Sequence, residues 1–207
     1  MLRGIEAEDY ETPTNCPPWT LHELVVHIAD SLWLPEDLPS PPAGAPLRTA
    51  ADYYRRDERD SAAYRKQNVE TAQQSARAVS AGAATVSYLS DALVRILTRL
   101  DQEGLDQVVD VPAVGAMRLE DYAATRVMSL AAHGLDVAIS LRRTPWTSRS
   151  ALTSTRKTLV ALLSQQPPAA LGWNDQQLLL TGTGRRGLTA HEQKCLGDLA
   201  GGFPLLS

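Results

Sequence analysis

The sequence predicts a mainly α fold, in which a four-helix bundle is followed by a small α/β appendage at the C-terminal end. Apolar residues recur at helical spacing in 20–33, 85–103 and 119–141, and they give each stretch one apolar face. Hydrophobic residues make up 43% of the 207 residues, enough for a core between such faces. Only 5% of the residues are aromatic, so aliphatic side chains must fill that core.

The first predicted helix, 20–33, has a strong start signal. Thr20 and Glu23 form a capping box, in which the hydroxyl accepts from a first-turn amide and the carboxylate reaches back. Its apolar face comprises Leu21, Leu24, Val25, Ile28 and Leu32. His22, in the first turn, is expected to be solvated. The prolines of 35–48 predict an irregular surface loop.

The middle of the chain predicts further helices. Residues 49–80 are polar and rich in good helix formers, and they predict either one long helix or two helices broken near Arg55–Asp60. Residues 85–103 predict a helix that Gly104 ends. Residues 107–117 are β-branched and contain Pro112 and Gly115, which indicates an extended connection or a short hairpin.

A change in composition after Pro145 predicts a boundary between a helical-bundle domain, 1–145, and a small α/β extension, 146–207. The extension is expected to contain helices at 150–165 and 189–200 and a short strand at 177–181. The segment Gly182–Gly187 matches G-x-G-x-x-G formally, but too little chain follows for a dinucleotide fold. A glycine-rich turn is the better interpretation, with Arg185 as a candidate contact for an anionic ligand.

Composition excludes several function classes. A net charge of -4 argues against nucleic-acid binding, and no apolar run approaches the ~20 residues that span a bilayer. The N-terminal residues show no signal-peptide pattern. Cys16 and Cys195 are interpreted as reduced thiols, with a disulfide as the alternative. We therefore expect a cytoplasmic protein with a small-molecule partner, no nucleic acid and no membrane; the oligomeric state stays open, with a homodimer as one alternative.

Two histidines suggest a shared site. His27 and His133 each lie at the edge of the apolar face of a predicted helix, and such edges can meet at a pocket in a bundle. Ser129 lies one turn before His133 on the same flank, and Arg126 is also there. Asp30 and Asp136 are expected to point outward. The alternative is a pair of unrelated histidines bonded to their neighbours.

The chain also resembles a known family. CPPWT at 16–20, followed by His27, resembles the CPGWT…L..HLA opening of the mycothiol-dependent maleylpyruvate isomerase family, within the DinB-like superfamily. The segment from Arg126 through Ser129 and His133 to Asp136 is similar to that family's RxxExxxHxxD motif. The ending at 188–207 is similar to family members as well.

The resemblance implies a DinB-like four-helix bundle that binds a divalent metal, zinc or nickel, through His–Glu–His. It also implies a mycothiol-type thiol as cosubstrate, whose pKa the metal would lower. The two histidine ligands map to His27 and His133. The glutamate maps to Ser129, which removes the only anionic ligand.

Two functional hypotheses follow. In the first, the protein is a metal- and thiol-dependent transferase or isomerase of a small electrophilic metabolite, with His27 and His133 at the catalytic centre. Arg126 and Arg185 would bind the substrate. In the second, it is a metal-free DinB-like descendant that uses the same pocket to bind a metabolite or for acid–base catalysis by the two histidines.

Overall fold

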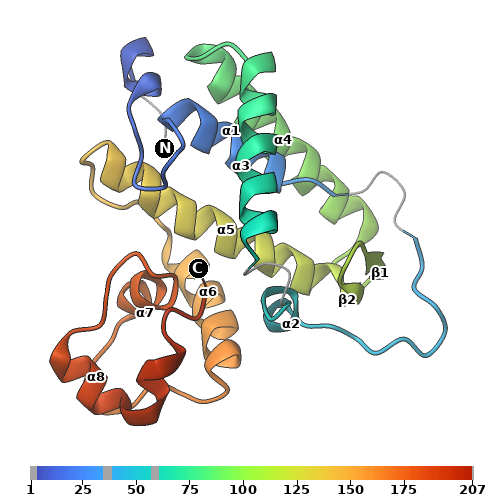
Figure 1. The fold of residues 1–207 in the computed structure, drawn as a ribbon. Helices are drawn as coiled ribbons and strands as arrows, with labels where there is room; N and C mark the ends of the chain where they lie inside the picture. The colour runs from blue at the N-terminus through green and yellow to red at the C-terminus, as the bar shows by residue number, and fades with distance from the viewer. Residues whose placement is uncertain (1–3, 35–38, 57–60, 207) are drawn as a thin grey trace.

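The computed structural model describes residues 4–34, 39–56 and 61–206, and it confirms a mainly α fold with a small two-stranded sheet (Figure 1). The helices are α1 (Leu21–Ser31), α2 (Ala50–Tyr54), α3 (Ala62–Ala78), α4 (Ala83–Glu103), α5 (Leu119–Ser140), α6 (Arg149–Leu163), α7 (Asp175–Gly182) and α8 (Ala190–Leu196). Short 3-10 helices are η1 (Ala7–Glu11), η3 (Ala169–Leu171) and η4 (Gly197–Gly202).

The local start signals are confirmed where the structure describes them. Thr20 Oγ1 accepts from the Glu23 amide at 3.3 Å, and the Glu23 carboxylate accepts from the Thr20 amide at 2.8 Å. The 49–80 region forms two helices, α2 and α3, rather than one. Residues 57–60 of the predicted break, like 35–38 of the proline-rich loop, lie outside the described residues.

The expected extended connection is an antiparallel hairpin formed by β1 (Val108–Val111) and β2 (Gly115–Arg118), with Val108 opposite Arg118. It leads directly into α5. The strand predicted at 177–181 is wrong, because these residues belong to α7. Asn174 accepts from the Gln177 amide and Gln177 caps in return, so local polar groups start a helix before the apolar run.

The Gly182–Gly187 segment therefore follows a helix and not a strand, which agrees with its interpretation as a turn. Gly184 has a φ of 70°, and a Cβ at this position would lie 3.3 Å from the side chain of Pro204. Both the backbone conformation and the close neighbour favour glycine here.

Helix α1 is the centre of the bundle, because α3, α4 and α5 each pack against it. The expectation that His22 is solvated is wrong for this reason. His22 is buried, and its ring nitrogens lie 2.9 Å from Thr85 Oγ1 and 3.0 Å from the Ala76 carbonyl oxygen. A histidine in the first turn of an edge helix would be solvated, but α1 is covered from several directions.

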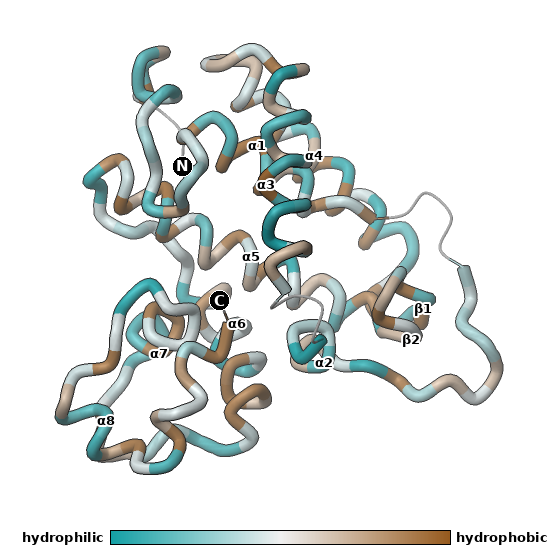
Figure 2. Tube along the Cα trace, viewed as in Figure 1, coloured by the Kyte–Doolittle hydropathy of each residue, from teal (hydrophilic) through white to brown (hydrophobic). Residues whose placement is uncertain are grey.

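Helix α5 belongs to both hydrophobic clusters of the protein. Tyr122 and Val137 pack in the cluster around α1, whereas Met128 and Leu135 pack in a second cluster with α6 and α7. The C-terminal helices thus group on one side of α5 (Figure 1), and hydrophilic residues are common on α3 (Figure 2). The boundary near residue 145 stays a prediction. Of the helices described, none has the length and apolar character required to cross a bilayer.

Candidate functional site

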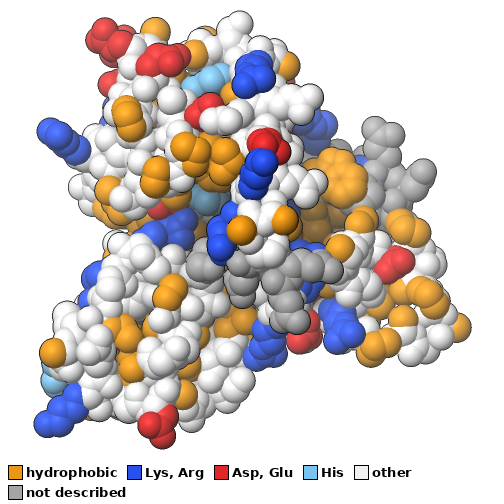
Figure 3. Space-filling view, viewed as in Figure 1, with side chains coloured by type: hydrophobic (Ala, Val, Ile, Leu, Met, Phe, Trp, Pro, Cys, Tyr) orange, Lys and Arg blue, Asp and Glu red, His pale blue; other side chains and the backbone are white. Residues whose placement is uncertain are grey.

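A cavity of about 590 Å³ brings together segments from the whole length of the chain. Its walls come from the loop before α1, from α1, α3 and α5, and from the C-terminal part. Basic and histidine side chains are visible at the centre of this face of the molecule (Figure 3). Its lining includes Asn15, Cys16, Trp19, His27, Ser129, His133, Asp136, Thr183 and Arg185.

The two imidazoles predicted to share a pocket do lie side by side. The ring centroids of His27 and His133 are 5.2 Å apart, and the rings are nearly perpendicular. The indole of Trp19 lies against His27, with centroids 4.4 Å apart, and 6.4 Å from the ring of His133. α1 and α5 pack directly on each other, and this packing brings the two rings together.

His133 is held by a buried carboxylate. Its Nδ1 lies 3.0 Å from Oδ2 of Asp136, which has no solvent exposure. The prediction that Asp136 points outward is wrong. Residues 134–138 are all buried, because α5 is covered by α1 on one side and by α6 on another. Because α5 is covered on two sides along residues 134–138, it has no solvent-facing side there.

Arg185, predicted as a contact for an anionic ligand, lies in the cavity wall and is paired with Asp136. Its Nε donates to Oδ1 at 2.8 Å, and a terminal nitrogen donates to Oδ2 at 2.5 Å. The other terminal nitrogen donates to the carbonyl oxygen of Thr183 at 3.2 Å. This two-point ion pair attaches the segment after α7 to α5, so the C-terminal part forms one wall of the site.

The electrostatics of Asp136 follow from these partners. Burial by itself raises the pKa of this carboxyl, but hydrogen bonds from His133 and Arg185 and their charge outweigh burial. The pKa of Asp136 is therefore held well below its usual range, and the group is an ionised acceptor. Since an ionised carboxylate only accepts, Nδ1 of His133 donates, and the neutral ring keeps its lone pair on Nε2.

Cys16, which was not assigned to the site from the sequence, lines the cavity beside His133 and Asp136. One donor atom each of Cys16, His133 and Asp136 lies within 4.8 Å of the others. Burial, followed by the charge of Asp136 and a hydrogen bond to it, raises the pKa of the Cys16 thiol to about 12. The amide of neighbouring Asn15 donates to Ser140 Oγ at 3.0 Å, which attaches this loop to α5.

Ser129 lines the histidine cavity, whereas Arg126 does not. The hydroxyl of Ser129 lies 3.3 Å from that of Ser31. Arg126 donates to the Ser31 carbonyl oxygen at 2.6 Å and lies over the rings of Tyr53 and Tyr122, so its role as a substrate contact stays a prediction.

Sequence signals for the missed residues existed. Cys16 lies immediately before the capped start of α1, where a loop residue can reach a pocket at that end. Asp136 is three residues after His133, the spacing at which side chains of a helix meet. Asp136 was placed in solvent because one buried face was assumed for α5, although the spacing of Asp136 from His133 indicated a contact.

We predict that Arg185→Met lowers the free energy of unfolding by about 3 kcal/mol at neutral pH, as measured by urea denaturation. The variant leaves Asp136 buried with His133 as its remaining partner. Because the pKa of Asp136 is lowered by folding, the stabilisation is present above about pH 4 and is lost as the pH falls below it. Arg156→Met, at the partly exposed pair with Asp175, should cost less than about 1 kcal/mol. Equal losses would contradict the role of the buried pair.

A second prediction concerns thiol reactivity. With a pKa of about 12, only about one ten-thousandth of Cys16 is thiolate at about pH 8. Iodoacetamide should therefore label Cys195, on the short surface helix α8, well before Cys16. Asp136→Asn removes the negative neighbour and should speed labelling of Cys16 in the folded protein. Peptide mass spectrometry over time measures both rates, and faster labelling of Cys16 in the wild type would refute this account.

Comparison with known proteins supports the family. Residues 1–138 match the family model described as the mycothiol maleylpyruvate isomerase N-terminal domain. No curated protein and no solved structure matched the chain. The matched region includes the loop with Cys16, all of α1, and α5 as far as Ala138. The chain therefore belongs to the mycothiol maleylpyruvate isomerase N-terminal domain family.

Proposed function

We propose that the protein is an enzyme, a transferase or isomerase that acts on a small electrophilic metabolite with a mycothiol-type thiol as cosubstrate. The observation that carries the proposal is the pairing of His133 with buried Asp136 beside His27, inside a cavity of about 590 Å³. The cavity is within the size range of small-molecule sites. Membership of a mycothiol-related family supports the choice of cosubstrate.

In the proposed reaction, His133 is the general base. Asp136 holds its Nδ1–H, so Nε2 carries the lone pair that removes the proton of the cosubstrate thiol. The resulting thiolate forms a bond to an electrophilic carbon, and the electron pair displaced there becomes a carbanion or enolate. The imidazolium returns the proton to that position. A transferase stops at this protonated adduct. In an isomerase, the carbanion or enolate instead rotates about the new single bond before any protonation and then expels the thiolate, which recovers its proton from the imidazolium.

A resident divalent metal fits the available donors poorly. The family-type set would comprise His27, His133 and Ser129, whose neutral hydroxyl is a weak ligand in place of a carboxylate. In the alternative set, Asp136 already binds Arg185 at both oxygens, and the thiol of Cys16 is protonated. A cation there would also lie beside the Arg185 guanidinium. For these reasons the proposed proton transfers use side chains of this chain alone.

The first test is ligand stabilisation. Mycothiol at about a hundredfold excess over its Kd should add roughly 2.7 kcal/mol to the free energy of unfolding. Thermal denaturation should show this shift for the wild type and for His191→Ala, on the surface of α8, but not for His133→Ala. An equal shift in His133→Ala would remove that residue from the site. The absence of any shift in the wild type would contradict the proposed cosubstrate.

The second test concerns the metal. We predict that the wild type binds zinc weakly and that Ser129→Glu raises the affinity by at least about tenfold, because it restores the missing anionic donor one turn before His133. Calorimetric titration of chelator-treated protein measures this. Ser87→Glu, at an exposed position of α4, is the matched control and should change nothing. Tight stoichiometric binding by the wild type, unchanged in Ser129→Glu, would show that another ligand set holds a metal.

A further inference from the structure

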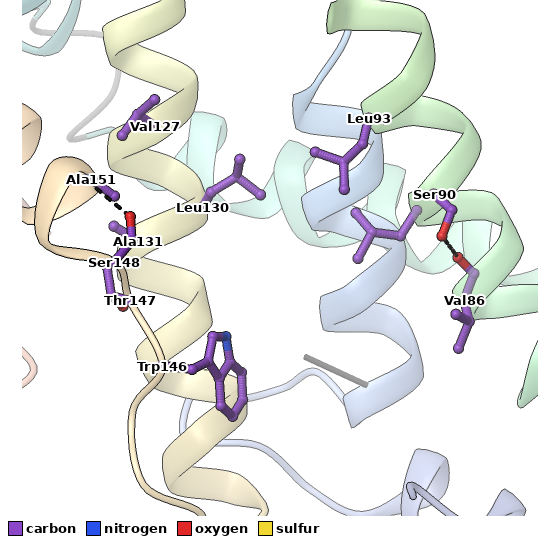
Figure 4. Close-up of a pocket in the computed structure, with 11 residues that line it drawn as sticks. Val86, Ser90, Leu93, Val127, Leu130, Ala131, Trp146, Thr147, Ser148 and Ala151 are labelled. Carbon is purple, nitrogen blue, oxygen red and sulfur yellow. Dashed lines mark hydrogen bonds between the residues drawn. The ribbon is translucent and has the colours of Figure 1, made fainter. Parts of the chain in front are cut away.

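A second cavity, of about 660 Å³, lies between α4 and α5. Both helices pack on α1, whereas they make at most marginal contact with each other. Figure 4 shows the resulting gap, with α5 on one side, α4 on the other and α1 behind. Leu93 of α4 and Leu130 of α5 extend toward each other across it, and Trp146 lies at one end.

The walls of this cavity are apolar and uncharged. Most of the lining side chains are aliphatic, and none of the described lining residues is ionisable. A charged ligand would lose its hydration here without gaining a counter-charge. Water would find few partners on such walls as well, and the volume is typical of small-molecule sites.

The few polar groups that line the cavity further limit the kind of ligand that it can bind. Ser90 Oγ donates to the carbonyl oxygen of Val86 at 2.8 Å, and Ser148 Oγ accepts from the Ala151 amide at 3.2 Å, so both serve their own helices. No described residue accepts a hydrogen bond from the indole N–H of Trp146, whose nitrogen lies on the cavity side of the ring in Figure 4. The hydroxyl of Thr147 is similarly without a described partner.

We propose that this cavity binds an uncharged, largely apolar small molecule that carries one hydrogen-bond acceptor oxygen. The aliphatic walls would take its hydrocarbon part, and the N–H of Trp146 would donate to its oxygen. Because the N–H of partly exposed Trp146 has no described partner, an acceptor oxygen placed against it adds a hydrogen bond to the apolar contact. A carbonyl, ester or ether oxygen meets this requirement, whereas a carboxylate does not.

The proposed site is separate from the histidine cavity. Val127 and Leu130 of α5 face the α4 side, whereas Ser129 and His133 line the histidine cavity. One helix therefore stands between the two cavities, and neither histidine lines the apolar one. The proposal does not depend on the thiol chemistry, and a variant in one cavity leaves the lining of the other unchanged.

The test uses prodan, an uncharged naphthalene dye with one ketone oxygen, whose emission shifts to the blue in an apolar site. Full-length wild-type protein should bind it saturably with one-to-one stoichiometry. Anilinonaphthalene sulfonate, a dye of similar size with a negative charge, should bind at least about tenfold more weakly, since the lining offers no counter-charge. Equal binding of both dyes would overturn the proposal.

Matched variants locate the bound dye. Ser90→Trp adds bulk at the cavity and should weaken prodan binding by about tenfold or more. Val94→Trp, one turn later at an exposed position that does not line the cavity, should not. Trp146→Phe keeps an aromatic ring and removes the donor. It should weaken binding about fivefold, the loss of one hydrogen bond worth about 1 kcal/mol.

Three outcomes would refute the proposal. Loss of binding in His133→Ala but not in Ser90→Trp would place the dye in the histidine cavity. Unchanged binding in Trp146→Phe would remove the assigned donor. In the third outcome, the wild type is a dimer that binds no prodan, and Ser90→Trp is a monomer. This result would show that a second copy of the chain covers the apolar cavity. Light scattering on the same samples identifies this last case.

Discussion

The buried carboxylate of Asp136 is the interaction on which the site depends. It has no solvent exposure, and it accepts from Arg185 at both oxygens and from Nδ1 of His133. An ion buried in this way is tolerated only when its lone pairs are satisfied, so both partners are needed. The same carboxylate therefore orients the imidazole, fixes its tautomer and attaches the C-terminal segment to α5.

The central position of α1 explains the two cavities. Helices α3, α4 and α5 all pack on α1. Where two of these three helices do not pack on each other, a gap remains between them that a ligand can enter. On one side of α5 the gap contains histidines, amides and an ion pair. On the other side it contains aliphatic side chains and one indole. One architecture thus provides two cavities, one lined partly by charged and imidazole side chains and one mainly by aliphatic side chains, on different sides of α5.

The family resemblance maps a ligand glutamate to Ser129, which lines the same cavity as Asp136. Among the described residues that line the cavity, the anionic charge lies on Asp136, and the guanidinium of Arg185 pairs with it. The positive charge comes from residue 185, beyond the region that matches the family model. In the proposed reaction, Asp136 would stabilise the imidazolium that forms when His133 removes the thiol proton.

The sequence by itself predicted the long bundle helices, the capped start of α1 and the positions of His27 and His133 at the edges of their apolar faces, because these depend on local periodicity and on motif spacing. For residues 107–117 it left an extended connection and a short hairpin as alternatives. It failed where burial depends on more than one neighbour. His22 and Asp136 were assigned to solvent on the assumption of one buried face, and only the tertiary structure shows that α1 and α5 are covered on several sides. The strand assigned to 177–181 is helix α7, since a run of leucines does not distinguish a strand from a buried helix. The partners of Arg126 and Arg185 were also decided by tertiary packing, because a long side chain reaches whichever acceptor the fold brings near it.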